Sequence, residues 1–255
     1  MIIKKDIVLK ILQLIDLTTL NNNDSYDTIK SLCNRSITPF GNVAAICIYS
    51  HFIEYAKKIY QDLGENIKIA TVVNFPYAMI DFELIKNEVY LAINRGVDEI
   101  DLVFPYHALM AGDADIGFNI VKGVRHICKN IVLKVIIESG ELKTSELIYQ
   151  ASKIAISAGC DFIKTSTGKV PVNATIDAVK VMLSAISDTN KECGIKVAGG
   201  VKNVEDAIGY YNLVKECMGE SWINFNTFRF GTSSLLDNLI NYLNNKEQII
   251  SANKY

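Results

Sequence analysis

The sequence predicts a single α/β domain in which eight βα units close into a barrel, the (β/α)8 or TIM-barrel class. Short runs rich in β-branched and aromatic residues alternate with segments of helical periodicity along the chain. The expected strands start roughly 25 to 35 residues apart, which is the length of one βα unit. A length of 255 residues suits such a barrel, and 49% hydrophobic with 21% charged residues is a globular composition.

Eight strands are expected, and the central ones are apolar on both faces, as in parallel sheets that helices cover. In chain order the strands are 16–20, 43–49, 67–73, 99–104, 132–137, 162–165, 195–198 and 226–230. The clearest helices are expected at 81–94, 114–128, 144–157, 175–186 and 204–214. A doubly wound open sheet would show the same alternation. However, no GxGxxG motif follows the first strand, and the count of eight favours closure.

The two ends of the chain are expected to differ from the barrel between them. Residues 1–16 carry three lysines and Asp6 among apolar positions, which predicts an extra amphipathic helix rather than a signal peptide. From about residue 246 the chain is polar, and we expect a flexible tail that ends at Tyr255. No linker interrupts the pattern, so one domain is expected to span residues 1–255.

Charge and cysteine content exclude several classes of function. The formal net charge of −2 offers no long-range attraction to nucleic acid or to anionic lipid, so neither is an expected partner. No stretch has the length and apolar character of a membrane span. The six cysteines form no CxxC pair and read as reduced residues of a cytoplasmic protein. The three histidines lack metal-ligand spacing and no cofactor motif is present, so neither a metal nor a cofactor is expected.

Polar residues at strand ends are the first candidates for function, because active sites of such barrels form at the carboxyl ends of the strands. Lys164 follows the apolar pair Phe162 and Ile163, which places its amine at the barrel mouth. A single strand lysine usually pairs with a carboxylate or reaches solvent. Lys134 and Lys196 occupy similar strand positions, and three lysines in one interior are costly unless carboxylates and a function compensate.

Schiff-base formation with an aldehyde is the chemistry that this pattern predicts for Lys164. The ordinary lysine pKa of about 10.4 leaves only about one amine in a few thousand neutral at pH 7. Lowering the pKa to about 7 requires the ammonium to be destabilised by roughly 4 to 5 kcal/mol. Partial burial and the neighbouring ammonium of Lys196 can supply that effect.

Two aspartates are expected to complete the catalytic group. Asp101 lies inside a barrel strand, where it can pair with Lys134 on the next strand. A carboxylate held among lysines can also relay the protons that carbinolamine formation, dehydration and carbon–carbon cleavage require. Asp16, at the first strand, either extends this network or has a structural role. Cys47, near the end of the second strand, can face the site, although a small buried thiol is the simpler interpretation.

Two successive loops after the last strands have the chemistry of a phosphate site. Gly199 and Gly200 follow a strand and precede Lys202 and a helix, so they offer backbone N–H groups, a helix N-terminus and a cation. Ser233 and Ser234 follow the last strand in the same way. Further candidate binding residues in the strand-end segments are Thr18, Thr167, Gly168, Lys169 and Gly231.

Several of these segments together resemble the deoxyribose-phosphate aldolases. Residues 162–169, Phe-Ile-Lys-Thr-Ser-Thr-Gly-Lys, resemble the Schiff-base motif of that family. The likeness covers nearly the whole chain, through the segments 16–20, 74–76, 101–105, 133–138, 196–200 and 230–235. Val197 stands where many members have Pro, and Lys202 stands where Arg is common. Lys202 can therefore hold phosphate only as a point charge.

The resemblance implies reversible cleavage of 2-deoxy-D-ribose 5-phosphate into D-glyceraldehyde 3-phosphate and acetaldehyde, in deoxynucleoside and deoxyribose catabolism. It implies sugar-phosphate and aldehyde ligands, no metal or cofactor, and a homodimer. By position, Lys164 corresponds to the imine-forming lysine, Asp101 and Lys196 to the proton donor and acceptor pair, and Lys134 to a supporting lysine. The phosphate loops of the family correspond to Gly199, Gly200, Ser233 and Ser234.

Tyr255 becomes a candidate through the same resemblance, because family members can end in a tyrosine on a flexible tail. Its phenol can exchange a proton with the enamine carbon through water, or the tail can act as a lid. A frayed end is the simpler interpretation. Two rival functions also stay open: a Schiff-base aldolase for a longer keto donor, and a sugar-phosphate-binding barrel without catalysis. The presence of Asp101, Lys164 and Lys196 together argues against the second.

Overall fold

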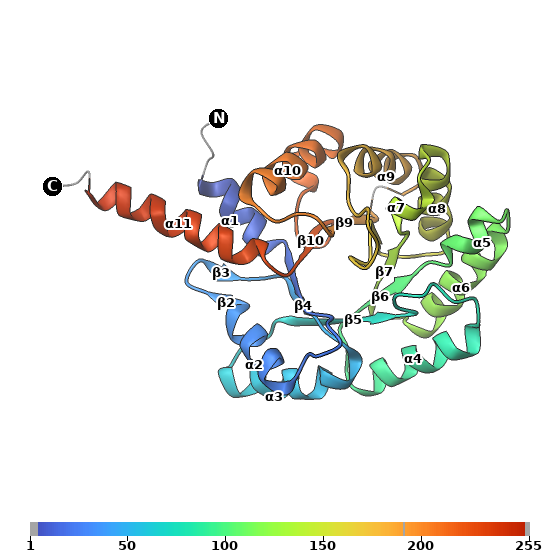
Figure 1. Ribbon diagram of the computed structural model, residues 1–255, viewed down its shortest axis with the longest axis horizontal. Coiled ribbons are helices and arrows are strands. Elements are labelled where there is room, and N and C mark those ends of the chain that lie inside the picture. Colours follow the sequence, from blue (N-terminus) through green and yellow to red (C-terminus); the bar gives the residue numbers. More distant parts are fainter. Residues whose placement is uncertain (1–4, 191, 253–255) are drawn as a thin grey trace.

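The computed structural model describes residues 5–190 and 192–252, and eight parallel strands closed into a barrel form its centre (Figure 1). The strands are β1 (Ile15–Thr18), β4 (Ala45–Cys47), β5 (Lys68–Val73), β6 (Glu99–Val103), β7 (Val132–Ile136), β8 (Phe162–Lys164), β9 (Gly194–Ala198) and β10 (Phe228–Thr232). Each strand pairs with the next in this order, and β10 pairs with β1 to close the barrel. The predicted eight-stranded barrel is confirmed, and the open sheet is excluded.

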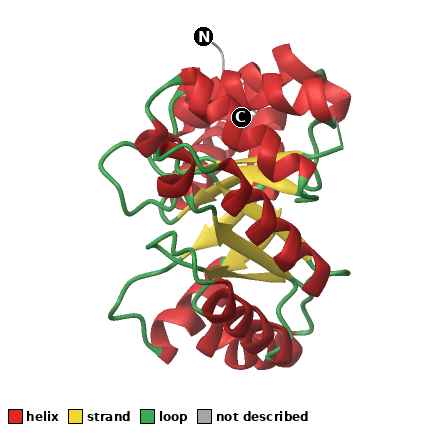
Figure 2. Ribbon diagram, turned by 90° about the vertical axis from the view of Figure 1, so that its right-hand side faces the viewer, coloured by secondary structure: helices red, strands yellow, loops and turns green. Residues whose placement is uncertain are grey.

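Helices cover the outside of the barrel, and Figure 2 shows them on both sides of the strands. Those that follow strands are α3 (Ile53–Leu63), α4 (Phe82–Asn94), α6 (Ala114–Ile127), α8 (Ser145–Ser157), α9 (Ile176–Thr189), α10 (Val204–Met218) and α11 (Leu235–Ala252). Several begin at a side chain that accepts a hydrogen bond from a backbone N–H of the first turn. These N–H groups have no partner within the helix itself. These N-caps are Asp81, Asp113, Thr144, Thr175 and Asn203.

The remaining elements precede the barrel or lie within its connections. Helix α1 (Lys5–Gln13) comes before β1, which confirms the extra N-terminal helix. Helix α2 (Tyr26–Arg35) follows β1 and is thus the helix of the first βα unit. The short elements are β2 (Ile37–Thr38), β3 (Gly41–Asn42), η1 (Ser50–Phe52), α5 (Tyr106–Met110), α7 (Ser139–Leu142) and η2 (Glu220–Trp222). The β2–β3 hairpin was not expected, because two residues per strand are too few to show a periodicity.

The C-terminal helix passes the point at which the sequence predicts a flexible tail. Helix α11 lies beside α1 and extends to Ala252, beyond residue 246 (Figure 1). Tyr255 lies outside the described residues, so its role and the mobility of the tail stay predictions. Among the residues that the structure describes, no helix has both the length and the apolar character needed to cross a membrane.

The barrel strands face two different environments, because successive side chains of a strand point to opposite faces. Side chains such as Ile100 pack against the helices and belong to the main hydrophobic core. A separate small apolar cluster consists of Leu20, Cys47, Ala70 and Val72. This cluster shares the inward face of the strands with buried charged side chains, because Ala70 is the neighbour of Glu99 and Val72 is the neighbour of Asp101. The charged side chains form the site described next.

Candidate active site

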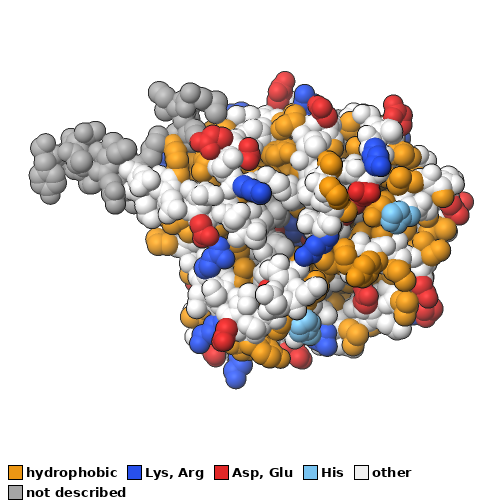
Figure 3. All heavy atoms as spheres, in the orientation of Figure 1, with side chains coloured by type: hydrophobic (Ala, Val, Ile, Leu, Met, Phe, Trp, Pro, Cys, Tyr) orange, Lys and Arg blue, Asp and Glu red, His pale blue; other side chains and the backbone are white. Residues whose placement is uncertain are grey.

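A pocket of about 570 Å³ lies at the carboxyl ends of the barrel strands. Figure 3 shows a hollow near the centre of the molecule, with Lys or Arg side chains around and inside it. The predicted site residues that line the pocket are Thr18, Lys164, Thr167, Gly168, Lys169, Gly199, Gly200, Lys202, Gly231, Ser233 and Ser234. The predicted residues that are instead completely buried and do not line it are Asp16, Cys47, Asp101, Lys134 and Lys196.

Asp101 lies at the centre of a charged cluster inside the barrel. Its Oδ1 accepts a hydrogen bond of 2.9 Å from Lys134, and its Oδ2 accepts bonds of 2.8 Å from both Lys164 and Lys196. Strand register explains this convergence. Asp101 is the β6 neighbour of Lys134 on β7, and Lys164 on β8 is the neighbour of Lys196 on β9. The structure therefore brings together the aspartate and the three lysines that the sequence predicts as one site.

Asp16, Glu99 and Arg229 extend this cluster. Asp16 Oδ2 lies 2.5 Å from Lys196 Nζ, and Glu99 Oε2 lies 2.5 Å from Lys134 Nζ. Both are ion pairs by distance, without the angles of a hydrogen bond. Arg229 donates hydrogen bonds of 2.5 Å to Asp16 Oδ1 and 3.1 Å to Glu99 Oε1. Asp16 thus belongs to the network rather than to a separate structural contact.

Sequence reasoning missed Glu99 and Arg229, although each has a recognisable signal. Glu99 stands two residues before Asp101 on the same strand, so both side chains point to the barrel interior. Arg229 is a lone charge between Phe228 and Phe230 in a buried strand. A buried charge needs a partner of opposite sign, so these positions could have been assigned to the same cluster.

The pKa values of the buried groups follow from these contacts. Burial opposes ionisation of Asp101, but the ammonium groups of the three lysines outweigh it and hold its pKa well below the usual range. For Asp16, burial is likewise outweighed by Lys196 and Arg229, and its pKa is lowered. Burial disfavours the ammonium forms of Lys134 and Lys196, yet neighbouring carboxylates raise both pKa values. These four groups are therefore charged at neutral pH.

Lys164 differs from the other two lysines. Its side chain is 4% exposed, against 0% for Lys134 and Lys196, and it alone of the three lines the pocket. Burial lowers the pKa of Lys164, Asp101 raises it and Lys196 lowers it again, and the net shift is downward. The sequence predicts that partial burial and the neighbouring cation together lower this pKa. In the structure burial is nearly complete and is the larger cause, while Lys196 adds to it.

The predicted phosphate loops form one wall of the pocket. Gly199 and Gly200 have φ angles of 80° and 87°, in the left-handed region that favours glycine. Helix α10 begins four residues after Gly200, and α11 begins directly after Ser234, so two helix N-termini adjoin the pocket. The positive end of a helix dipole favours a bound anion. At the start of α11, the backbone N–H groups of Ser234 and Leu235 donate to Thr232 Oγ1 at 3.3 and 3.2 Å.

Two predicted binding residues also have structural roles. A methyl group on Gly231 would lie 3.0 Å from Cε of Lys196, so this glycine leaves room for the lysine. Nζ of Lys169 donates a hydrogen bond of 2.7 Å to the backbone carbonyl of Leu20. This bond joins the loops that follow β8 and β1 across the pocket.

Glu138 is a further residue near the site that sequence reasoning missed. It is fully buried just after β7, and its backbone is left-handed with φ 56°. Its two carboxylate oxygens accept the backbone N–H of Thr167 at 3.2 and 3.3 Å, which holds the turn that follows Lys164. Burial raises the pKa of Glu138. A left-handed backbone at a residue other than Gly or Asn carries little signal in a sequence, which explains the omission.

Cys47 is completely buried in the barrel interior. It packs with Leu20, Ala70 and Val72 rather than lining the pocket. Burial raises the pKa of its thiol to about 11, so the group is neutral at pH 7. Its thiol lies within the electrostatic reach of Asp101 and the three lysines, and a role of Cys47 in substrate binding stays a prediction.

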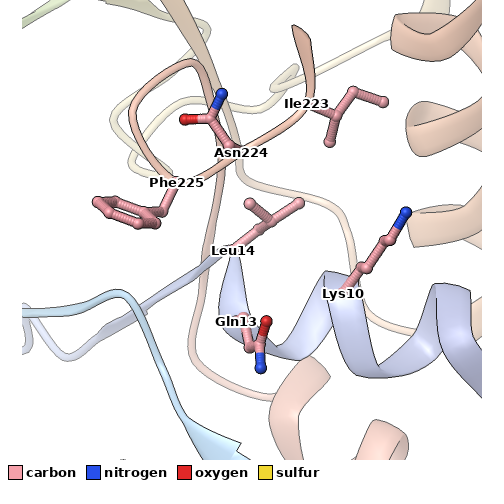
Figure 4. Close-up of a pocket in the computed structure, with 6 residues that line it drawn as sticks. All are labelled: Lys10, Gln13, Leu14, Ile223, Asn224 and Phe225. Carbon is pink, nitrogen blue, oxygen red and sulfur yellow. The ribbon is translucent and has the colours of Figure 1, made fainter. Parts of the chain in front are cut away.

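A second cavity, of about 240 Å³, lies at the opposite end of the barrel (Figure 4). Its lining residues precede β1 and β10 and are Lys10, Gln13, Leu14, Ile223, Asn224 and Phe225. Lys10 is the one ionisable group among them, and it donates a hydrogen bond of 3.1 Å to the exposed Glu220. This contact raises the pKa of Lys10, so its amine stays protonated, and none of the described residues that line the cavity carries a carboxylate. This cavity is therefore not the candidate active site.

Comparison with known proteins identifies the family of this chain. The model of the DeoC/LacD family of aldolases matches residues 10–237, a span that contains every barrel strand. A solved structure named as a deoxyribose-phosphate aldolase from Coccidioides immitis is 26% identical, covers 90% of this chain and 85% of its own, and has a TM-score of 0.79. An aldolase designated QR15 is 25% identical over 94% of this chain and 98% of its own, with a TM-score of 0.78. The tetrameric deoxyribose phosphate aldolase from Aeropyrum pernix shares the fold, with a TM-score of 0.75, 21% identity and 92% coverage of both chains. This chain therefore belongs to the DeoC/LacD family of aldolases.

Proposed function

We propose that this family member is a deoxyribose-phosphate aldolase that works through an imine on Lys164. The observation that carries the proposal is the position of that lysine. Its amine is the member of a buried charged cluster that reaches an open pocket, and the same pocket is walled by two loops suited to phosphate. The name of the Coccidioides immitis protein agrees with this substrate.

In the proposed reaction, the neutral amine of Lys164 attacks the C1 aldehyde of open-chain 2-deoxy-D-ribose 5-phosphate. Loss of water gives an imine, which accepts the electron pair released when the C2–C3 bond breaks. The C3 hydroxyl loses its proton and becomes the aldehyde of D-glyceraldehyde 3-phosphate. The enamine that remains on Lys164 is protonated at C2 and hydrolysed to acetaldehyde, which restores the amine.

Asp101 and Lys196 are placed to serve the proton transfers. Asp101 Oδ2 accepts hydrogen bonds of 2.8 Å from both lysines, so it connects the reacting amine to a second ammonium. Proton transfer by such positioned groups contributes about 10² to 10⁴ in rate. We also propose that no metal takes part, since the three carboxylates nearest the lysines are engaged by cationic side chains.

Incubation of the purified protein with 2-deoxy-D-ribose 5-phosphate, followed by product analysis with NMR, tests this function. We expect acetaldehyde and D-glyceraldehyde 3-phosphate in equal amounts, at a rate that a chelator leaves unchanged. The Lys164→Met variant is the control and should form neither product. A protein that cleaves only sugars with a longer keto donor would replace this proposal by the rival Schiff-base aldolase.

Three finer proposals rest on the family resemblance. Tyr255 is proposed to exchange protons at the methyl carbon of acetaldehyde, and a variant that lacks it should lose deuterium exchange more than thermal stability. A homodimer is proposed, and light scattering of the purified chain tests it. We propose the cytoplasm as the site of action, in deoxynucleoside and deoxyribose catabolism.

A further inference from the structure

Arg229 is held in the barrel interior by several contacts, and it does not line the pocket. It is 3% exposed and is not among the residues that line the cavity. One terminal nitrogen donates to Asp16 at 2.5 Å, the other donates to Glu99 at 3.1 Å, and Nε donates to the carbonyl of Phe225. The guanidinium carbon also lies 5.7 Å from the ring centre of Phe162, which is on the strand of Lys164. A guanidinium does not lose its proton in proteins, so this charge is permanent.

Glycine at position 194 makes this arrangement possible. A side chain there would place its Cβ 2.5 Å from the ring of Phe162 and 2.8 Å from the carbonyl oxygen of Thr227. The bare backbone therefore leaves space for the ring on which the guanidinium of Arg229 lies. Three adjacent strands, β8, β9 and β10, thus contribute Phe162, Gly194 and Arg229 to one side of the charged cluster.

The charges of the groups that ion pairs join inside the barrel do not balance when all are ionised. The cluster contains four cations, Lys134, Lys164, Lys196 and Arg229, and three carboxylates, Asp16, Glu99 and Asp101. One positive charge is in excess, and an excess charge in a dry interior is expensive. Loss of one proton from one lysine restores the balance.

Contacts decide which lysine gives up that proton. Lys134 lies within 4 Å of three carboxylates, at 2.5 Å, 2.9 Å and 3.6 Å, and Lys196 lies 2.5 Å and 2.8 Å from two. Lys164 contacts one carboxylate, Asp101, through the same Oδ2 that Lys196 occupies. The ammonium form of Lys164 is therefore the least stabilised of the three.

We propose that Arg229 is a positioning residue that engages Asp16 and Glu99 and thereby leaves Lys164 as the lysine without a proton. Without Arg229, Asp16 could neutralise Lys196 alone and Glu99 could neutralise Lys134 alone. Asp101 would then be free to hold the ammonium of Lys164. The inference rests on the imine chemistry proposed above, because it explains how the nucleophile becomes neutral.

The other groups that act on Lys164 and Arg229 leave this argument intact. Besides Asp101 and Lys196, the groups that influence Lys164 are the thiol of Cys47 on β4 and the carboxyl group of Glu138 after β7. Neither contacts Arg229 or its two carboxylate partners. Around Arg229, the charged neighbours are Asp16 on β1, Glu99 on β6 and, at longer range, Lys134 on β7. Substitution at Arg229 or Glu99 therefore changes the charge count without removing a group that touches Lys164.

Reductive methylation with formaldehyde and cyanoborohydride, followed by mass spectrometry of the Lys164 peptide across a pH series, measures the neutral amine directly. In Arg229→Met the interior would contain three cations and three carboxylates, so Lys164 would keep its proton. We expect the pH at which Lys164 becomes reactive to rise by about 0.5 to 1 unit, a three- to tenfold loss of neutral amine at lower pH. Arg229→Lys keeps the charge but loses the planar fork that directs one nitrogen to Asp16 and the other to Glu99, so its shift should be smaller.

Glu99→Gln supplies the opposite change and a rescue. It increases the excess to two positive charges, so the reactive pH of Lys164 should fall below that of the wild type. The double variant Arg229→Met with Glu99→Gln restores an excess of one and should return the reactive pH towards the wild-type value. If Arg229→Met does not fold, Glu99→Gln still tests the proposal against the wild type, and the double variant should have a higher reactive pH than Glu99→Gln.

A merely structural role for Arg229 predicts a different pattern. Both single variants would then impair the protein without moving the reactive pH, or would move it in the same direction, and either outcome would overturn the proposal. Formaldehyde labelling does not require cleavage of deoxyribose phosphate. Failure of this inference is therefore distinguishable from failure of the proposed substrate.

Discussion

The interior of the barrel and the rim of its pocket differ in the groups that stabilise charge. Side chains in ion pairs do so in the interior, and backbone groups do so at the rim. In the interior, side chains of opposite sign lie 2.5 to 3.6 Å apart and are almost completely buried, so each charge alters the protonation of its neighbours. At the rim, Gly199, Gly200 and two helix N-termini offer backbone groups at the edge of an open pocket. The comparison teaches that the reactivity of Lys164 depends on the whole network of buried charges. Anion binding at the rim needs only the groups that contact the anion. Substitutions inside should change chemistry and its pH dependence, and substitutions at the rim should change affinity for phosphate.

The largest effect is expected when the nucleophile is removed and a rim lysine serves as its matched control. Lys164→Met should abolish both imine formation and turnover, because no other amine of the cluster reaches the pocket. Lys169→Met removes an amine that contacts the carbonyl of Leu20, and it should keep imine formation. Assays of turnover and of borohydride trapping on both variants check this. If borohydride still trapped an imine in Lys164→Met, a lysine outside the buried cluster would have to be the nucleophile, which would contradict the distinction between interior and rim.

Removal of the central carboxylate should have the next largest effect. In Asp101→Asn, turnover should fall by about 10² to 10⁴, the usual contribution of a positioned acid–base group. The neutral fraction of Lys164 should not fall, because Asp101 raises the pKa of this lysine and its loss removes that effect. Parallel measurement of turnover and of reductive methylation at Lys164 separates the two roles. A parallel loss of both signals would mean that Asp101 only maintains the fold.

Removal of the neighbouring cation should shift the pH dependence. Lys196→Leu relieves the competition for Asp101 Oδ2 and removes a positive field, so the pKa of Lys164 should rise. A raised pKa means less neutral amine, so the rate of imine formation at pH 7 should fall by about 10- to 100-fold, one to two pH units. Lys196→Arg should keep part of the effect. Imine formation measured against pH gives the answer, and an unmoved profile in Lys196→Leu would exclude the coupling.

The smallest effect is expected at the rim. Ser234→Asp adds a carboxylate beside the proposed phosphate, and kcat/KM for the phosphorylated sugar should fall by about tenfold, or 1.4 kcal/mol. Turnover of unphosphorylated deoxyribose should change little, because a hydroxyl group is not repelled. Ser234→Asn is the neutral control of the same shape. Equal losses on both sugars would show that this loop does not bind the phosphate.

The sequence was most informative where residue type carries the chemistry. A strand lysine at a barrel mouth and a glycine pair before a helix were enough to predict that Lys164 and Gly200 line the pocket. The pairing of Asp101 with Lys134 also followed, because consecutive strands of a parallel barrel are neighbours. These predictions needed only element order and the identity of the residues at strand ends.

The sequence was less informative where register or backbone geometry decides the contact. Arg229 and Asp16 lie 213 positions apart, and only barrel closure by β10 and β1 brings them together. Glu138 has a left-handed backbone that its residue type does not reveal. The sequence also could not show that burial lowers the pKa of Lys164 more than the neighbouring cation does. The size of the burial effect depends on how completely the interior excludes water.

The central claim is that, of the lysines within residues 5–190 and 192–252, Lys164 alone is both neutral enough and exposed enough to form an imine with a small aldehyde. Treatment of the intact protein with acetaldehyde and borohydride at pH 7, followed by peptide mapping, tests it most directly. The account predicts that a stable ethyl group is found on Lys164 at limiting reagent, with the rim lysines Lys169 and Lys202 largely unmodified. Preferential labelling of either rim lysine, or equal labelling of all three, would contradict it.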